Sequence, residues 1–129
     1  MARTTGQFTP VIRCVSTAIP PYRFVQMTAS NQGTVSGASD NDIIGVSDGS
    51  NILFDDADHA NVGDPVRLQV GDIKRIECLA AVAAGGRVTS GAGGTATFAT
   101  TGDEFYGIAL QTGGAADFID MLWLSGLTP

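Results

Sequence analysis

Hydrophobic and polar residues alternate in short runs along this chain, and small turn-forming residues separate the runs. In Val66–Val70 (VRLQV) the apolar side chains fall on every second position, which is the period of a strand with one buried face. No segment keeps a helical spacing of apolar residues over three turns. The chain is therefore expected to be all-β, a small β-sandwich or β-barrel. The strands that the pattern predicts are Val11–Val15, Tyr22–Thr28, Asp42–Ser47, Asn51–Phe54, Pro65–Val70, Ile73–Leu79, Arg87–Ser90, Thr95–Ala99, Tyr106–Gln111 and Asp117–Leu124.

Three connections have informative local sequences. Gly71-Asp72 follows Val70 and predicts a tight hairpin, because both residues tolerate a positive φ. Leu79–Ala84 (LAAVAA) allows one turn of helix or a continuing buried strand. Gly91–Ala96 matches a loose dinucleotide-binding pattern, but a strand is expected after it where that site needs a helix. We therefore expect a hairpin loop there.

A short internal echo links the two halves of the chain. Asp42–Val46 (DIIGV) resembles Glu104–Ile108 (EFYGI), which begins 62 residues later, from 42 to 104. Both read acid, two apolar residues, glycine and a β-branched residue. A glycine at such a position often marks a bulge or close backbone packing. The echo indicates either a decayed duplication or a chance similarity over five positions.

The N-terminal part differs from the rest in composition and charge. Pro10 and Pro20-Pro21 disfavour helix and favour extended backbone. Residues 1–39 hold three arginines and no acid, whereas the rest of the chain holds 13 acids and four bases. We expect residues 1–21 to form an extended arm before a single β domain of residues 22–129. The arm would dock on an acidic surface, unless its arginines are simply solvated.

The C-terminal segment Phe118–Leu124 (FIDMLWL) is nearly all apolar. Apolar residues on both faces predict a strand buried on both sides, either central in its domain or covered on one face by another subunit. Trp123, the only tryptophan, could anchor such an interface or belong to the core. The candidate interface residues are Arg3, Phe8, Val11, Ile12, Arg13 and Trp123.

Composition narrows the function classes. The 129 residues are 43% hydrophobic and 16% charged, with a net charge of −6. This acidity argues against nucleic-acid binding. No apolar run reaches the roughly 20 residues of a membrane helix, and no apolar signal core begins the sequence, so neither membrane insertion nor secretion by that route is expected. Cys14 and Cys78 fit no metal spacing and are expected to be buried thiols, with a disulfide as the alternative.

The candidate catalytic and metal sites lack the surrounding sequence that their chemistry needs. Gly45–Gly49 (GVSDG) matches the GxSxG pattern, but the helix that a nucleophile elbow needs is not predicted after it. His59 is the one available histidine base. The acids Asp55, Asp56 and Asp58 could form an irregular calcium loop, although the spacing of an EF-hand is not met. We expect no catalytic, cofactor or metal residues, and the chain is not expected to be an enzyme.

The second half carries an ordered series of motifs: Ala60–Val66, Val70–Asp72, Leu79–Ser90, Gly94–Ala96, Tyr106–Leu110 and Phe118–Leu122. With the DIIGV strand, this order resembles the capsid cement, or head decoration, proteins of tailed bacteriophages over roughly residues 22–124. Their chains often read AxVxAGxxVTSxxxG, then GIAL, then an apolar closing strand. The arginines of the N-terminal segment have no counterpart in that pattern.

The resemblance implies a protein made in the bacterial host cytoplasm and located on the outer surface of the virion capsid. It would bind at symmetry or quasi-symmetry axes of the mature head and bridge subunits of the major capsid protein non-covalently. It would associate with itself, with a trimer favoured over a dimer, and bind neither nucleic acid nor membrane. A head fibre base, a head-completion protein and a carbohydrate- or host-surface-binding β domain remain alternatives.

Overall fold

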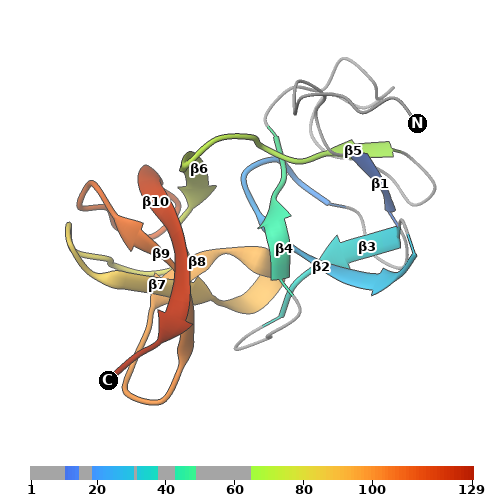
Figure 1. Cartoon of the computed structure of the whole chain (residues 1–129). Coiled ribbons are helices and arrows are strands. Elements are labelled where there is room, and N and C mark those ends of the chain that lie inside the picture. The colour runs from blue at the N-terminus through green and yellow to red at the C-terminus, as the bar shows by residue number, and fades with distance from the viewer. Residues whose placement is uncertain (1–10, 15–18, 31, 38–42, 49–64) are drawn as a thin grey trace.

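The described part of the chain is built almost entirely from β-strands (Figure 1). The computed structural model describes residues 11–14, 19–30, 32–37, 43–48 and 65–129, and for residues 11–13 it describes the backbone. One short 3₁₀ turn and no α-helix occur within these ranges. The expected all-β class is confirmed. Among the described residues, no helix has the length and apolarity to span a bilayer.

The first five strands form one sheet with the order β4-β2-β3-β1-β5, in which β1 and β3 run parallel and the other pairs run antiparallel. The two edge strands meet just beyond their ends, where Ser47 and Leu68 form an isolated bridge. The sheet therefore closes on itself, and we call it the N-terminal barrel. Its strands are β1 (Val11–Cys14), β2 (Phe24–Ala29), β3 (Gln32–Val35), β4 (Ile43–Val46) and β5 (Pro65–Arg67).

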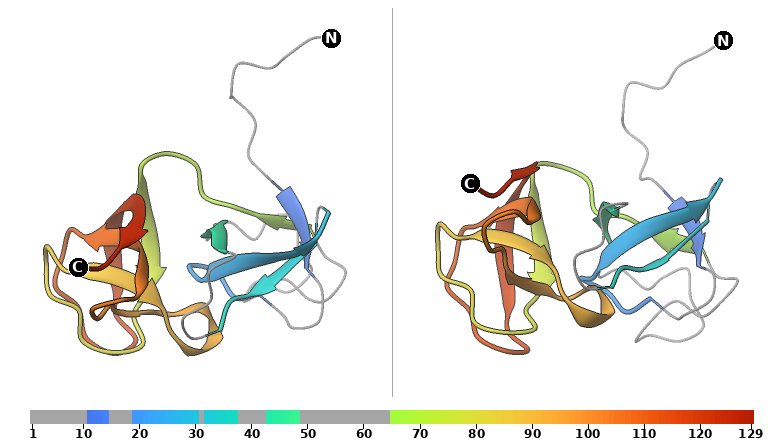
Figure 2. Two further views of the ribbon diagram at one scale, coloured as in Figure 1. Left: turned by 60° about the horizontal axis from the view of Figure 1, so that its bottom comes forward. Right: turned by 90° about the horizontal axis from the view of Figure 1, so that it is seen from below.

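The last five strands form a second sheet with the order β6-β10-β9-β7-β8. Cys78, directly after β6, forms a parallel bridge with Ala96 in β8, and the Leu79 amide donates to the Ala96 carbonyl at 2.8 Å. This sheet also closes, and we call it the C-terminal barrel. Figure 2 shows the two barrels side by side. The strands are β6 (Ile73–Glu77), β7 (Arg87–Ser90), β8 (Ala96–Phe98), β9 (Glu104–Ala109) and β10 (Phe118–Leu127).

The two barrels have the same circular strand order. In each, the first strand lies between the fifth, antiparallel to it, and the third, parallel to it. In each, the second strand lies between the third and the fourth. Cys14 and Cys78 make the equivalent parallel pairings with the third strands and lie 64 residues apart, from 14 to 78, close to the spacing of the sequence echo. The topology therefore supports duplication over chance.

The glycine at the fourth position of both echo motifs has the same structural role in both barrels. A Cβ on Gly45 would lie 3.3 Å from Cδ1 of Leu68, which continues the fifth strand. A Cβ on Gly107 would collide with Met121 in β10, the fifth strand of the other barrel. The missing side chain thus lets the fourth strand of each barrel lie close to the fifth.

The two barrels share part of their core. Successive residues of β2 point to opposite faces, so Val25 packs inside the N-terminal barrel while Phe24 joins the core of the C-terminal barrel. The first cluster comprises Cys14, Ile19, Val25, Val66 and Leu68. The second comprises Phe24, Val46, Ile76, Cys78, Val82, Val88, Ala96, Tyr106, Ala109, Ile119 and Met121. The shared cluster makes the barrels one packed body.

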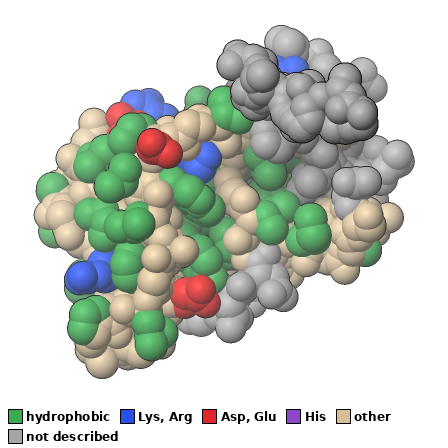
Figure 3. All heavy atoms as spheres, in the orientation of Figure 1, with side chains coloured by type: hydrophobic (Ala, Val, Ile, Leu, Met, Phe, Trp, Pro, Cys, Tyr) green, Lys and Arg blue, Asp and Glu red, His purple; other side chains and the backbone are tan. Residues whose placement is uncertain are grey.

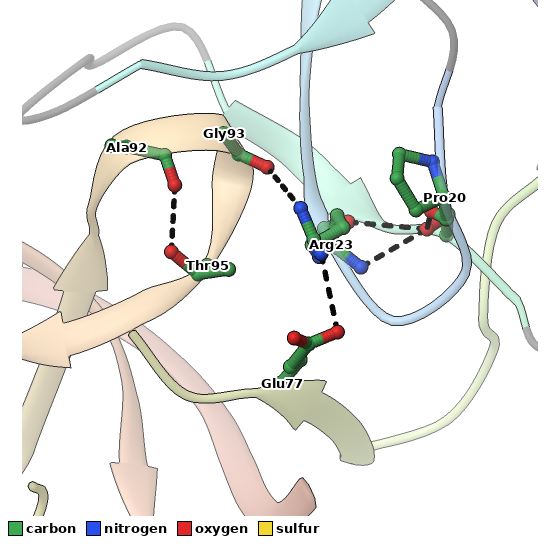
Figure 4. Close-up of polar contacts among 7 residues, drawn as sticks. Pro20, Arg23, Glu77, Ala92, Gly93 and Thr95 are labelled. Carbon is green, nitrogen blue, oxygen red and sulfur yellow. Dashed lines mark hydrogen bonds and ion pairs between the residues drawn. The ribbon is translucent and has the colours of Figure 1, made fainter. Parts of the chain in front are cut away.

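Polar contacts reinforce this junction (Figure 4). The Arg23 guanidinium donates to the Gly93 carbonyl at 2.9 Å and to Glu77 Oε1 at 3.2 Å. The buried hydroxyls of Ser36 and Ser90 contact each other across the junction. Charged groups held by two partners keep a fixed position. The N-terminal and C-terminal barrels are therefore joined by directional bonds as well as by apolar packing.

The expected arm and the described structure differ over residues 11–21. Val11–Cys14 is β1, paired on both sides within the N-terminal barrel, and Ile19 is 2% exposed. The predicted strand Val11–Val15 corresponds to β1, so its assignment to an arm outside the domain is what differs. Pro21 lies in the turn before β2, where Tyr22 has a positive φ of 62°. Residues 1–10 lie outside the described residues.

Two expected connections and one strand differ from the structure, and one expected strand is not tested by it. The Val70–Ile73 connection was predicted as a hairpin; Gly71 has the positive φ of 96°, but β5 and β6 belong to different sheets. Leu79–Ala84 is neither helix nor strand, and only Val82 forms a bridge there, to Gly113. β3 was not predicted, because its sequence QGTV has little apolar alternation. The expected strand Asn51–Phe54 lies outside the described residues.

Candidate interaction surface

The longest strand, β10, carries apolar side chains on both of its faces. Ile119 and Met121 point inward and are at most 1% exposed. Phe118 and Leu122, on the opposite face, are 47% and 36% exposed. β10 is a central strand, between β6 and β9. On its outer face the Tyr22 ring contacts Phe118 at a centroid distance of 5.2 Å, while Leu122 stays half exposed. Two reasons were expected for apolar residues on both faces of this strand, a central position in its domain and cover by another subunit. The central position accounts for the inner face only.

The outer face of the C-terminal barrel continues this apolar character across three strands. Leu122 is paired with Ile73 of β6 and with Ile108 of β9, so the three side chains form a row across the sheet. Ile73 is 51% exposed. Arg87 of β7 is paired with Ile108 and ends the row. We call Ile73, Leu122 and Ile108 the β10 face.

Charged and aromatic groups border the β10 face. Arg75 and Asp120, two register positions along and on the same face, form an exposed ion pair with Nε and Oδ1 3.3 Å apart. Leu110 lies beside this pair, since its amide donates to the Asp120 carbonyl. In Figure 3, hydrophobic side chains gather over the C-terminal barrel with isolated charges between them. A contiguous apolar patch with a polar rim is typical of a protein–protein contact surface.

Trp123 packs against the core. Its ring is stacked with that of Tyr106 at a centroid distance of 6.4 Å and lies 6.4 Å from that of Phe24. The Lys74 ammonium lies 5.3 Å from the centre of the Trp123 ring and donates to the Gln69 carbonyl at 2.8 Å. Burial lowers the pKa of Lys74, and the nearby Asp72 opposes this shift. Trp123 is therefore a half-buried residue of the core edge, and its interface role stays a prediction.

The structure does not bring the predicted interface residues into one site. Val11, Ile12 and Arg13 lie in β1, opposite Arg67, Val66 and Pro65, whereas Trp123 lies in the other barrel. Arg3 and Phe8 lie outside the described residues. Sequence reasoning missed Ile73, Ile108 and Leu110 as surface residues, because strand alternation identifies faces without saying which face is covered. The two-sided apolarity of Phe118–Leu124 was the available signal.

The residues considered for catalysis or metal binding either stabilise the fold or lie outside the described residues. The Ser47 hydroxyl donates to the Pro20 carbonyl at 2.7 Å and accepts the Arg23 amide at 3.0 Å, so it holds the turn before β2. His59 and the acids Asp55, Asp56 and Asp58 lie outside the described residues. In the ranges that are described, no group of three or more His, Cys, Asp or Glu side chains could hold a metal ion.

The cysteines are both buried and lie in different core clusters, Cys14 in the N-terminal barrel and Cys78 in the C-terminal one. Burial raises the pKa of the Cys78 thiol, and the negative charges of Asp117 and Glu77 add to this effect. A thiol with a raised pKa is a poor nucleophile at neutral pH.

No protein-family model and no curated protein sequence matches this chain. Among solved structures, the chain is similar to the head fiber gp8.5 N base of bacteriophage phi29. The TM-score is 0.67 at 14% sequence identity, and the alignment covers 91% of this chain and 93% of that one. At this identity the likeness shows a common fold over nearly the full length of both chains.

Proposed function

We propose that this chain is a structural protein of a bacteriophage virion that attaches to the outer surface of the head. The observation that carries the proposal is the fold likeness to a phage head fiber base, which spans nearly all of both chains. The motifs that resemble head decoration proteins point to the same part of a virion. The proposal assigns the chain a binding role without catalysis.

The β10 face supplies a means of attachment. Ile73 and Leu122 are half exposed in the isolated chain, and a partner that covers them removes apolar area from water. Burying one such side chain completely is worth about 1.5–3 kcal/mol, part of which is offset by the cost of association. Copies arranged around a symmetric site on the head would add such contacts together.

The first specific role is head decoration, in which the chain bridges neighbouring subunits of the major capsid protein without covalent bonds. Its support is the series of sequence motifs in the second half of the chain. A symmetric association of the chain with itself, as a trimer or a dimer, would place several β10 faces against the capsid lattice.

The second specific role is the base of a head fibre, and the fold likeness favours it directly. A base protein must hold the capsid on one side and the fibre on another. The C-terminal barrel offers the β10 face, and the N-terminal barrel lies beside it (Figure 2). The two roles differ in copy number and in whether a thin fibre extends outward.

Cosedimentation of the purified chain with mature heads that lack it tests the proposal. Saturable binding at hundreds of copies per head supports decoration. Saturation at a few tens of copies or fewer, with fibres visible by cryo-electron microscopy, supports a fibre base. Absence of binding to the heads of its cognate phage would refute both roles.

A pair of variants tests the β10 face. Ile73→Lys adds a charge to the face, and Met27→Lys adds the same charge at the 44% exposed Met27 in the N-terminal barrel. If the face attaches the chain, Ile73→Lys should weaken head binding by roughly tenfold or more, in line with the loss of one buried apolar side chain. Met27→Lys should bind like the parent. Equal binding by all three proteins would exclude the β10 face as the attachment surface.

A further inference from the structure

The last part of β10 extends beyond its neighbour β6. β6 pairs with Phe118–Leu122, and the final contact on that side is the Trp123 amide donating to the Asp72 carbonyl at 2.7 Å. Beyond it, the register with β9 shifts at Leu124 and Ser125, and Gly126 and Leu127 pair with β9 alone among the described residues. Figure 1 shows β10 running past β6 toward the C-terminal end of the chain. We call Leu124–Leu127 the open end of β10.

Two other strand edges of the described chain are capped or partly closed. The Gln69 side chain occupies the outer edge of β6, where its amide donates to the Arg75 carbonyl at 2.7 Å and its oxygen accepts the Arg75 amide at 2.9 Å. The bridge between Cys78 and Ala96 covers part of the β8 edge. Proteins usually block unpaired edges, because such an edge binds a further strand. The open end of β10 has no such side chain or bridge on its free edge among the described residues, and beyond its register shift Gly126 and Leu127 remain in extended pairing with β9.

The open end is apolar and lies beside acidic groups. Leu124 is 50% exposed, and Leu127, at 71%, is the most exposed large hydrophobic residue of the described chain. Glu104 is paired with Leu127, and Asp72 borders the other limit of the open end. The cations beside this end, Lys74 and Arg87, each lie over an aromatic ring, that of Trp123 and that of Phe105. An extended segment with apolar side chains, a positive charge and no acid suits this edge.

We propose that residues 1–10 of a second copy of this chain add a strand to the open end of β10. The segment MARTTGQFTP contains Arg3 and Phe8, two β-branched threonines in succession and no acidic residue. Main-chain hydrogen bonds would form along the edge, Phe8 would cover Leu124 or Leu127, and Arg3 would lie near the acidic groups. The inference concerns the protein alone and does not rest on its proposed function.

A second copy is the donor for a geometric reason. Residue 10 precedes β1, and Figures 1 and 2 place β1 and the end of β10 on opposite sides of the molecule. Four residues in a strand span about 13 Å, so the other six residues of the segment could reach about 20 Å between copies. Donation from one copy to the next is a head-to-tail contact, and such contacts form a ring when the rotation closes.

Photo-cross-linking tests the donor and the acceptor together. The full chain carries p-benzoylphenylalanine in place of Phe8 and is mixed with an equal amount of ¹⁵N-labelled parent chain before irradiation. The proposal expects cross-links to residues 124–127 that join the segment of one isotope to the open end of the other. Cross-links within a single copy, cross-links elsewhere, or no cross-link in the self-associated protein would overturn it.

Sedimentation of full-length variants tests the energetics. Leu127→Lys places a charge on the open end and opposes Arg3, so self-association should weaken by roughly ten- to a hundredfold, the equivalent of one lost buried leucine. Met27→Lys, at an exposed position in the N-terminal barrel, should leave it unchanged. Circular dichroism confirms that both variants are folded. Equal self-association of the variants, or a parent chain that stays monomeric at high micromolar concentration, would overturn the proposal.

Discussion

Gly94 offers the sharpest test of how the two barrels are joined. It lies between β7 and β8 and rests against β2 of the N-terminal barrel. A Cβ at this position would be 2.7 Å from the Phe24 carbonyl oxygen and 3.2 Å from the Arg23 Cβ. Its φ is +78°, which disfavours any residue with a side chain. Gly94→Ala therefore carries a conformational cost and a collision with the backbone of the other barrel.

Gly71 separates the two costs. Its φ is +96°, and a Cβ there would meet nothing within 4 Å. Gly71→Ala should lower the free energy of unfolding by about 1–2 kcal/mol, the cost of the left-handed conformation alone. Gly94→Ala should lower it by about 3–5 kcal/mol, because the junction must also open or shift. For a chain of this length, the difference corresponds to roughly 4 °C in Tm per kcal/mol.

Urea unfolding followed by Trp123 fluorescence and by circular dichroism measures both variants. Trp123 packs against Phe24, so its fluorescence reports on the junction. If the junction is as tight as described, Gly94→Ala has the lower midpoint, and its two signals separate when the barrels loosen first. Equal losses of stability in the two variants, within about 0.5 kcal/mol, would refute the tight contact between Gly94 and β2.

Three further predictions concern charged and titrating groups. Arg23→Ala should lower the free energy of unfolding by about 1–3 kcal/mol, because it leaves the Gly93 carbonyl and the Glu77 carboxylate without this hydrogen-bond donor. A double-mutant cycle in urea should give an Arg23–Glu77 coupling energy of about 1 kcal/mol or less, and an Arg23→Ala variant as stable as the parent would contradict the junction contacts. Burial lowers the pKa of Lys74, so between this lowered pKa and the ordinary lysine value the unfolded state binds more protons than the folded state. The free energy of unfolding, measured relative to that of Lys74→Met, should therefore rise with pH across this window, and a fall would contradict the burial of Lys74. The raised pKa of Cys78 should make its labelling by a thiol reagent near pH 8 slow in the native protein and fast in urea, and equal rates would contradict its burial.

The sequence was a good guide to the fold class and to most strands, because alternation and turn residues report local geometry directly. It missed β3, whose Gln32-Gly33-Thr34-Val35 sequence becomes a strand through pairing with β1 and β2. It placed β1 in an arm, since proline and arginine content cannot distinguish a solvated extended segment from a paired one. Tertiary pairing decides both cases, and single-segment patterns do not contain it.

The candidate surface was harder to predict than the fold. The apolar Phe118–Leu124 segment indicated that something covers both faces of a strand, but its register against β6 and β9 decides which residues join it. Ile73 and Ile108 become its neighbours through that register. Positions paired across strands are distant in sequence, so their grouping requires the structure.

The repeated strand order gives this chain an internal comparison that no relative has to supply. Register equates Val25 with Val88, which pair with Gly45 and Gly107, and Cys14 with Cys78, which pair with Gly33 and Ala96 of the third strands. The residue type is kept at these valines, at the cysteines and at the glycines of the fourth strands. It changes from Arg13 to Glu77, where the C-terminal barrel binds Arg23 beside β2 of the N-terminal barrel. The two barrels can thus be aligned with each other. Residues that they share mark what the barrel requires, and residues that differ mark where one barrel became specialised.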